Sequence, residues 1–234
     1  MHFITLAPPV PTLARWLRFA RTFKGQSMLR MLQYERLWTI ALAGRVLDMG
    51  GGRKAHYLPM LPAGLTVCSV NIDPRIEPTH LVQPGQPLPF AQDHFDTVIC
   101  LNTLEHIYDA TAVLSELFRV VKPQGTVHVM VPFMFRIHGH PDDFFRATPS
   151  WWRESFARAG FASMQFFPLV WGRRSTGSVV PGFYGPFPRL RLHLAMLLDI
   201  LTAKLLLKGD TIAGRRGESI CGTSPGWYMI GTKG

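Results

Sequence analysis

The sequence predicts an α/β domain in which a mostly parallel sheet carries helices on both faces. From residue 45 onward, short apolar runs alternate with stretches long enough to form helices. Hydrophobic residues make up 47% of the chain and charged residues 17%, a balance typical of a folded globular protein. The 234 residues are enough for one domain with a sizeable core, or for one domain with a large insertion.

Apolar runs mark the strands of the predicted sheet in order. They are RVLDM at 45–49, TVCSVNID at 66–73, FDTVICL at 95–101, GTVHVMVPF at 125–133, and further runs at 161–167 and 226–233. Residues 111–121 and 149–160 have helical patterns, which end at a Lys-Pro-Gln-Gly turn and at Gly160 respectively. Because strands alternate with helix-length connections, each crossover returns the chain parallel to the preceding strand.

The positive charge lies in two flanking segments. Lys and Arg outnumber Asp and Glu by 7 to 1 in residues 1–45 and by 8 to 2 in residues 170–216, whereas residues 46–169 hold 9 against 11. We therefore expect residues 1–44 to form an N-terminal basic amphipathic helical segment. Residues 45–234 would form the main domain, with an insertion at about 168–225. Such flanks are typical of segments that meet an anionic surface.

Several protein classes are disfavoured by composition. The three cysteines are an odd number without a paired motif, which argues against a disulfide framework or a zinc site and favours a reducing cytoplasm. The start of the chain lacks a charged region before an apolar core and contains three prolines, unlike a signal peptide. No apolar run reaches transmembrane length.

A glycine cluster ends the first strand. Gly50, Gly51 and Gly52 follow Asp48 and Met49, where a backbone at the carboxyl end of a parallel strand can approach a ligand closely, and a helix is expected next. On these residues alone, three interpretations stay open. They are a turn without a ligand, a nucleoside cofactor site, and a dinucleotide site in which Asp73 binds the ribose.

The sequence downstream resembles the class I S-adenosylmethionine (SAM)-dependent methyltransferases, in particular type 11-like members. The resemblance covers about residues 45–167 and rests on VLDMGGG at 46–52, Asp73, LPF at 88–90, FDTV at 95–98, LEH at 104–106 and RVVKPQG at 119–125. The closing GWYMIGTK resembles this family's antiparallel last strand. The resemblance implies a Rossmann-like class I methyltransferase fold with a seven-stranded, mostly parallel sheet, and SAM as the cofactor.

The resemblance also implies roles for individual residues. Gly50 and Gly52 would line the methionine and ribose of SAM, and Asp48 would lie near its amino group. Asp73 would accept hydrogen bonds from both ribose hydroxyls. The full cofactor-binding set expected is Asp48, Gly50, Gly51, Gly52, Asp73, Pro74, Gln86, Leu88, Asn102, Thr103 and Leu104. The chain departs from the family at Lys54, which replaces a third glycine, and at Pro84, which replaces an adenine-binding acid; Gln86 is the candidate substitute.

Catalysis in this family needs a nucleophile aligned with an already electrophilic methyl group, and a hydroxyl acceptor must also lose its proton. The candidate bases are His106, His138 and His140, which follow core strands. Residues 143–149 resemble the DFFRxTP segment of methyltransferases of glycan or surface-polysaccharide assembly, so Asp142, Asp143 and Arg146 are expected to bind the substrate. A structural Asp143–Arg146 ion pair is the alternative. We expect no metal site, because neighbouring loop residues rarely converge on one ion.

Two basic amphipathic stretches have several possible roles. Residues 12–24 place Leu13, Trp16, Phe19, Ala20 and Phe23 opposite Arg15, Arg18, Arg21 and Lys24, and residues 190–207 form a leucine-rich helix. They could pack on the domain as a lid, form a homodimer contact, or lie on the inner face of the cell membrane. Nucleic acid is not an expected partner, because no recognised binding module is present.

The predicted function is transfer of a methyl group from SAM to a small-molecule, sugar or lipid-linked glycan acceptor, at a hydroxyl. One alternative is a non-catalytic SAM-binding scaffold, which the departures at Lys54 and Pro84 leave open. The other is a nicotinamide-dependent oxidoreductase, which the motif series from LPF to RVVKPQG disfavours.

Overall fold

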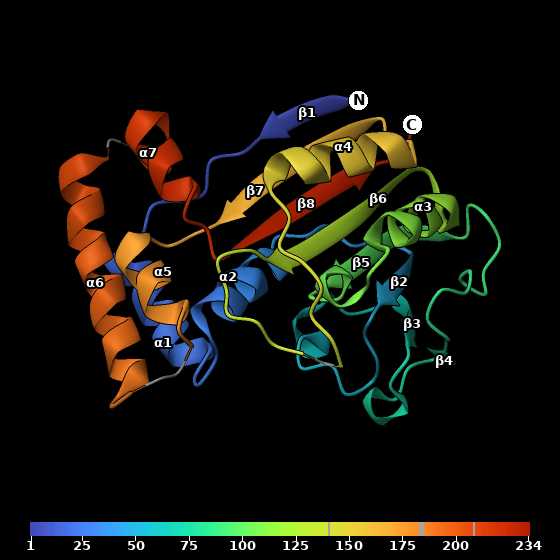
Figure 1. Ribbon diagram of the computed structural model, residues 1–234, viewed down its shortest axis with the longest axis horizontal. Helices are drawn as coiled ribbons and strands as arrows, with labels where there is room; N and C mark the ends of the chain where they lie inside the picture. Colours follow the sequence, from blue (N-terminus) through green and yellow to red (C-terminus); the bar gives the residue numbers. More distant parts are fainter. Residues whose placement is uncertain (140, 183–184, 208) are drawn as a thin grey trace.

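The computed structural model describes residues 1–139, 141–182, 185–207 and 209–234. Within them, one eight-stranded sheet has the order β1-β7-β8-β6-β5-β2-β3-β4 (Figure 1). The strands are β1 (His2–Thr5), β2 (Arg45–Met49), β3 (Thr66–Asn71), β4 (His80–Leu81), β5 (Phe95–Leu101), β6 (Val121–Pro132), β7 (Ser163–Leu169) and β8 (Gly226–Thr232). β8 is antiparallel to β6 and β7, and the other pairs are parallel. This confirms the predicted Rossmann-like class I fold.

The outermost strand β1 is an addition to the predicted sheet. Strands β2, β3 and β5 to β8 correspond to the six predicted runs, and β4 completes the seven that the family resemblance implied. β1 pairs in parallel with β7 from His2 to Thr5. Four residues before a proline-rich stretch carry too little periodicity to predict a strand. The start of the chain is therefore fixed by long-range pairing rather than by a local signal.

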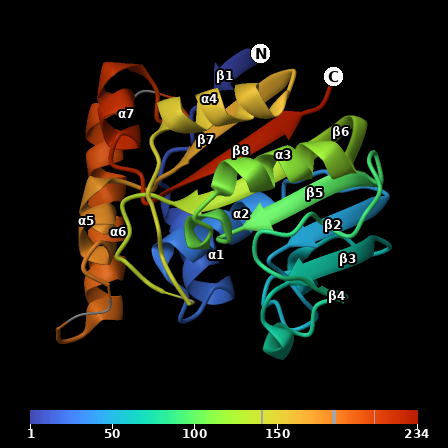
Figure 2. The same ribbon diagram turned by 45° about the vertical axis from the view of Figure 1, so that its right-hand side comes forward.

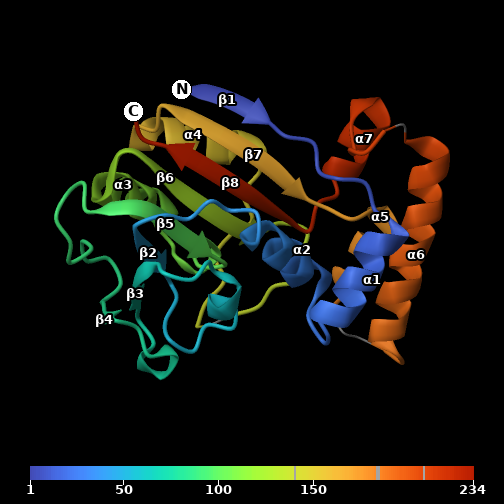
Figure 3. The ribbon, with the colours of Figure 1, turned by 180° about the vertical axis from the view of Figure 1, so that it is seen from behind.

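Seven α-helices surround the sheet in the described residues. They are α1 (Leu13–Thr22), α2 (Met28–Leu37), α3 (Ala110–Val120), α4 (Pro149–Ala159), α5 (Arg173–Val179), α6 (Pro188–Leu206) and α7 (Gly214–Cys221). α3 and α4 cover one face (Figure 2), and α2 lies on the opposite face (Figure 3). α1, α5, α6 and α7 group beyond one end of the strands (Figures 1 and 3). Among the helices described, none is long and apolar enough to span a bilayer.

Two apolar clusters stabilise the two faces. Phe95, Trp152 and Phe156 are fully buried between the sheet and the α3–α4 layer. On the other face, Phe19 of α1 and Met196 of α6 are fully buried in a second cluster that also includes residues of α2 and the sheet. Each such side chain contributes about 1.5–3 kcal/mol relative to an exposed position. α1 and α6 are consequently parts of the core.

The expected polar arc of α1 is only partly exposed to solvent. Arg15 is 7% exposed, and its guanidinium donates to the Glu35 carboxylate of α2 at 2.5–3.0 Å while it stacks 4.8 Å from the Trp171 ring. Conversely, Leu13 of the predicted apolar arc is 54% exposed. The reason is that α1 contacts both α2 and α6, so the buried part of its surface extends beyond a single stripe.

The structure has no α-helix directly after the glycine cluster, so the prediction of one there was wrong. Residues 50–65 contain only a 3-10 turn, η1 (Leu58–Met60). Pro59 and Pro62 lack amide hydrogens, so an α-helix through this segment would lose backbone hydrogen bonds. A cavity of about 510 Å³ lies beside this segment, over β2 and β3, and is lined among others by Asp48, Gly52 and Ser69.

Candidate active site

The carboxyl ends of the parallel strands bring the predicted site residues to one edge of the sheet. β2 ends at Met49, β3 at Asn71, β5 at Leu101 and β6 at Pro132. The loops that follow hold the glycine cluster, Asp73 and the candidate histidines. In sheets of this kind, ligands bind at this edge because the strand order reverses there.

Gly50 is required by the packing of this edge. It has a φ of 88°, and its amide donates to the Val70 carbonyl at 2.8 Å. A Cβ at Gly50 would lie 2.1 Å from Oγ1 of Thr103, so the loop after β2 packs directly on the loop after β5. Asn71 holds the turn from the other side, since its Nδ2 donates to the Gly50 carbonyl at 2.6 Å. Sequence analysis missed Asn71, a polar residue at the end of an apolar strand.

Asp48 is buried beneath the glycine turn. Its carboxylate accepts hydrogen bonds from the Tyr57 hydroxyl at 2.7 and 2.9 Å. Burial raises the pKa of Asp48 to about 7, against the lowering effect of the Tyr57 hydrogen bond. Asp48 thus supports the turn from below in this structure, and it also lines the cavity beside the turn.

Asp73 follows β3 and begins the 3-10 turn η2 (Pro74–Ile76). Its carboxylate accepts from the Arg75 amide at 2.9 Å and from the Arg75 guanidinium at 2.8–3.1 Å. Asp73 is not among the residues that line the cavity beside the glycine turn. To bind a ribose, the Asp73 carboxylate would have to exchange its hydrogen bonds from the Arg75 guanidinium for hydrogen bonds from the ribose hydroxyls. The Arg75 side chain is 77% exposed and can therefore move into solvent. Pro74 lies exposed beside it.

The two basic residues after the glycine turn bind η2. Nζ of Lys54 lies 2.8 Å from Glu77 Oε1, and Arg53 donates to Oε2 of the same carboxylate. The Arg53 and Lys54 amides also donate to the Glu77 and Ile76 carbonyls. Lys54, which departs from the family pattern, therefore ties the glycine turn to the segment after Asp73. Surface ion pairs of this kind contribute little by themselves, so the backbone bonds carry most of the connection.

The loop after β5 connects the glycine turn to α2. Asn102 has a φ of 49°, and its side-chain amide exchanges two hydrogen bonds of 2.7 and 3.0 Å with Gln33 of α2. Thr103 contacts the turn as described above. The side chains of Leu88 and Leu104, by contrast, are buried in the core, and Gln86 is exposed in a loop. Among the expected cofactor residues, the structure groups those around the glycine turn and places these three elsewhere.

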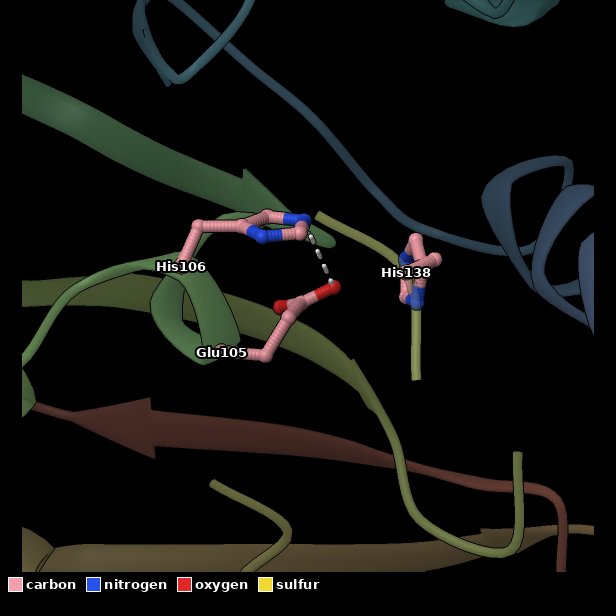
Figure 4. A group of neighbouring side chains, drawn as sticks. All are labelled: Glu105, His106 and His138. Carbon is pink, nitrogen blue, oxygen red and sulfur yellow. Dashed lines mark ion pairs between the residues drawn. The ribbon is translucent and has the colours of Figure 1, made fainter. Parts of the chain in front are cut away.

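Glu105, His106 and His138 form a cluster next to this loop (Figure 4). One ligand atom from each lies within 4.8 Å of the others, and the two imidazole rings meet edge to face at 5.2 Å. Nδ1 of His106 donates to the Asp142 carbonyl, and Nε2 of the same ring lies 3.7 Å from Glu105 Oε1. A carboxylate and two imidazoles are a donor set that suits proton transfer or a divalent cation.

Glu105 is the residue of this cluster that sequence analysis did not select. It is 1% exposed, and neither carboxylate oxygen has a hydrogen-bond partner among the described residues. Burial raises the pKa of Glu105 to about 8, so the protonated acid predominates at neutral pH. Its position inside the LEH motif was visible in the sequence, but its burial was not.

Asp143 and Arg146 support His138. The Asp143 carboxylate, 3% exposed, accepts from the His138 amide at 2.8 Å, lies 3.4 Å from His138 Nδ1 and pairs with the Arg146 guanidinium. The burial of Asp143 acts to raise its pKa, but hydrogen bonds from Arg146 and His138 lower it below its ordinary value. The ion pair considered as an alternative is therefore present. Asp142 is exposed and contributes its carbonyl to His106.

Burial lowers the pKa of His138, so this imidazole is neutral at physiological pH. With Nδ1 facing Asp143 and the Arg136 carbonyl, Nε2 is the nitrogen left to accept a proton. His140, the third candidate base, lies outside the described residues. The structure thus brings two of the three candidate histidines together.

His138 also lines a cavity of about 250 Å³, which we call the acceptor cavity. Its walls come from the α1–α2 connection with the first turn of α2, from the loop after β6, and from the facing ends of α5 and α6. Polar groups are supplied by Gln26, Ser27, Arg30, Arg136 and His138, and apolar ones by residues such as Leu192.

Comparisons with known proteins agree with this architecture. Residues 16–168 match the methyltransferase domain family. An uncharacterized protein of Mycobacterium tuberculosis is 35% identical over 99 residues, which cover 37% of this chain and 36% of that protein. A ubiquinone biosynthesis O-methyltransferase of Dechloromonas aromatica is 28% identical over 123 residues, 46% of this chain and 51% of that protein. The match thus spans about a third to a half of these relatives.

A solved structure of similar fold is a SAM-dependent methyltransferase from Archaeoglobus fulgidus. It aligns with a TM-score of 0.54 over 93% of this chain and 99% of that chain, at 14% identity. Similarity at this level of identity shows the fold alone. Together with the match over residues 16–168, it shows that the chain belongs to the methyltransferase domain family, the class I fold whose members use S-adenosyl-L-methionine as the methyl donor.

Proposed function

We propose that this protein transfers a methyl group from SAM to a hydroxyl of a small-molecule, sugar or lipid-linked glycan acceptor, with His138 as the general base. The observation that carries the proposal is the position of His138, which is neutral, held by Asp143 and part of the acceptor cavity wall. A base must lie at the acceptor and be unprotonated before reaction. His138 lines the cavity in which we propose the acceptor binds, and its lowered pKa favours the unprotonated form.

The carboxyl edge has the features needed to hold the cofactor. Gly50 keeps the turn free of a side chain, and Thr103 packs against it and donates to the Met49 carbonyl. In this proposal the Asp73 carboxylate leaves Arg75 and accepts hydrogen bonds from the ribose hydroxyls of SAM. SAM supplies a methyl group made electrophilic by its sulfonium. The task left to the protein is to orient the hydroxyl oxygen in a water-poor cavity and to remove its proton.

Proton removal follows from the contacts of His138. The Arg136 carbonyl accepts from Nδ1–H of His138 at 3.3 Å, which fixes the tautomer with an unprotonated Nε2. The Asp143 carboxylate, 3.4 Å from Nδ1, stabilises the imidazolium once the proton has moved. Arg146 holds the Asp143 carboxylate in place through two hydrogen bonds, so the support is rigid. The neighbouring pair of Glu105 and His106 offers a second acid–base group beside the same loop.

The walls of the acceptor cavity favour an oxygen-rich acceptor. Arg30 and Arg136 donate only, and Gln26 and Ser27 donate and accept, a combination that suits hydroxyl and anionic groups. The resemblance at residues 143–149 to methyltransferases of glycan assembly supports a sugar-containing acceptor. The similarity to ubiquinone biosynthesis O-methyltransferases supports transfer to oxygen. In this proposal, residues 1–44 and the insertion at 168–225 serve as the acceptor-side wall.

The proposal is tested with labelled SAM and a panel of sugars, phenols and lipid-linked glycans. The wild-type protein should label a hydroxyl compound, and His138→Gln should lower turnover at least a hundredfold while SAM affinity stays unchanged. The control is His80→Gln, an exposed histidine on edge strand β4, which should retain activity. Full turnover by His138→Gln would exclude His138 as the base, and exclusive labelling of amines would exclude the hydroxyl assignment.

A further inference from the structure

A third cavity, of about 720 Å³, lies at the far end of the α5–α6 pair from the acceptor cavity. Four arginines line it: Arg173 and Arg174 at the start of α5, and Arg215 and Arg216 in the first turn of α7. The acceptor cavity uses the opposite ends of α5 and α6, so the two sites are separate. We call this the arginine cavity.

The positive charge of the arginine cavity is not neutralised by the protein around it. Asp199 is the one acidic residue among the residues described as lining it, and its carboxylate accepts from the amides of Arg174 and Ser175 and from the Ser175 hydroxyl. Its distance to the Arg174 guanidinium is 4.0 Å. Arg173 and Arg174 otherwise bind neutral groups, the hydroxyls of Ser219 and Thr202. Guanidinium groups held this way are arranged to receive an anion.

Part of the remaining wall is apolar, and the same helix α6 also carries an exposed leucine face. Leu206, Leu207 and Ile212 line the arginine cavity. On the outer side of α6, five leucines spaced by three or four residues form one stripe and are each at least half exposed: Leu190, Leu194, Leu198, Leu201 and Leu205. An apolar stripe of this length beside a basic cluster is complementary to a surface with anionic groups above hydrocarbon.

We propose that the arginine cavity binds the phosphate groups of anionic lipids, while the leucine face of α6 lies against the bilayer that carries them. The arginines supply charge-assisted, forked hydrogen bonds to phosphate oxygens, and the leucines enter the boundary between headgroups and acyl chains. This inference does not depend on methyl transfer. It concerns where the protein works, whereas the acceptor cavity concerns what it acts on.

The test is sedimentation of the full chain with vesicles of phosphatidylcholine alone or mixed with an equal part of phosphatidylglycerol, at low salt and at about 0.5 M NaCl. Binding should require phosphatidylglycerol and fall at high salt. Arg215→Gln combined with Arg216→Gln should weaken it at least tenfold. Leu194→Ser combined with Leu198→Ser should weaken it as well. SAM affinity should be unchanged in each variant, which reports that the fold is intact.

The matched control is Arg153→Gln combined with Arg158→Gln on α4, which removes the same charge far from the arginine cavity. Its vesicle binding should equal that of the wild type. Equal loss in this control would show a general charge effect and overturn the proposal. Absence of vesicle binding by the wild type would also overturn the proposal. If calorimetry then detected binding of inorganic pyrophosphate, the ligand of the arginine cavity would be a soluble phosphate instead.

Discussion

Replacing Glu105 by Gln should change how the stability of this protein depends on pH. Glu105 is 1% exposed without a described hydrogen-bond partner, and burial raises its pKa from 4.5 to about 8. Between these values the folded protein keeps the proton while the unfolded chain has lost it. The stabilisation from the neutral acid is therefore fully present below about pH 4.5, decreases as pH rises, and is lost above about pH 8.

The size of the effect follows from the same two pKa values. Each pH unit in this interval costs the wild type about 1.4 kcal/mol, which gives about 2 kcal/mol by pH 6 and about 5 kcal/mol by pH 8. Glu105→Gln does not titrate and avoids this loss. Its buried amide instead costs about 1–3 kcal/mol at every pH. The variant should thus be less stable than the wild type at pH 5 and more stable at pH 8.

Urea unfolding at pH 5, 6, 7 and 8, followed by tryptophan fluorescence without SAM, measures the two slopes. Asp48, whose pKa is raised by burial to about 7, titrates in both proteins, so its contribution cancels in the difference. Glu154→Gln is the control, because that side chain is 62% exposed and should leave the slope unchanged. Equal slopes for wild type and Glu105→Gln would refute the argument and would mean that Glu105 is ionised in the fold.

Three further predictions concern the cofactor edge and the cluster around His138. Asp73→Ala should weaken SAM binding at least tenfold in calorimetry, whereas Arg75→Ala should leave it equal or tighter, because Arg75 competes for the same carboxylate. Gly50→Ala should destabilise the fold by about 2 kcal/mol or more in urea unfolding, since its Cβ would meet Thr103 and its φ is positive. Dialysis against EDTA should leave methyl transfer unchanged. If activity were lost and returned only when a divalent cation was added, the cluster of Glu105, His106 and His138 would hold a metal.

The parts of the site that the sequence predicted are those set by local backbone requirements. The glycine cluster follows a strand because a close approach to the next loop excludes a side chain, and that constraint is visible in three consecutive glycines. Asp73 and the candidate histidines could be predicted because they follow parallel strands, whose carboxyl ends meet at one edge of the sheet. The prediction of a helix after the glycine cluster was wrong because it gave the two prolines of that segment, Pro59 and Pro62, too little weight.

Other contacts could not be predicted because their partners are far apart in the chain. Gln33 and Asn102 are 69 residues apart, and no local pattern indicates that their amides pair. Asn71 lies in a predicted strand, and nothing in the local sequence indicates that its side chain donates to the Gly50 carbonyl. Glu105 required knowledge of what covers the loop after β5. In each case a buried polar group was identified only when the three-dimensional packing was known.

α2 links the two halves of the candidate site physically. Gln33 on this helix bonds Asn102 in the loop that contacts the glycine turn, and Arg30, one helical turn earlier, lines the acceptor cavity. α2 also lies in the apolar cluster shared with α6. A helix fixed by a buried core on one side keeps both contacts in register, so in the proposed reaction packing would set the position of the acceptor relative to the cofactor. The same core extends through α6 to the exposed leucine face, so a bilayer held there would lie on the outer side of a helix that also walls the acceptor cavity.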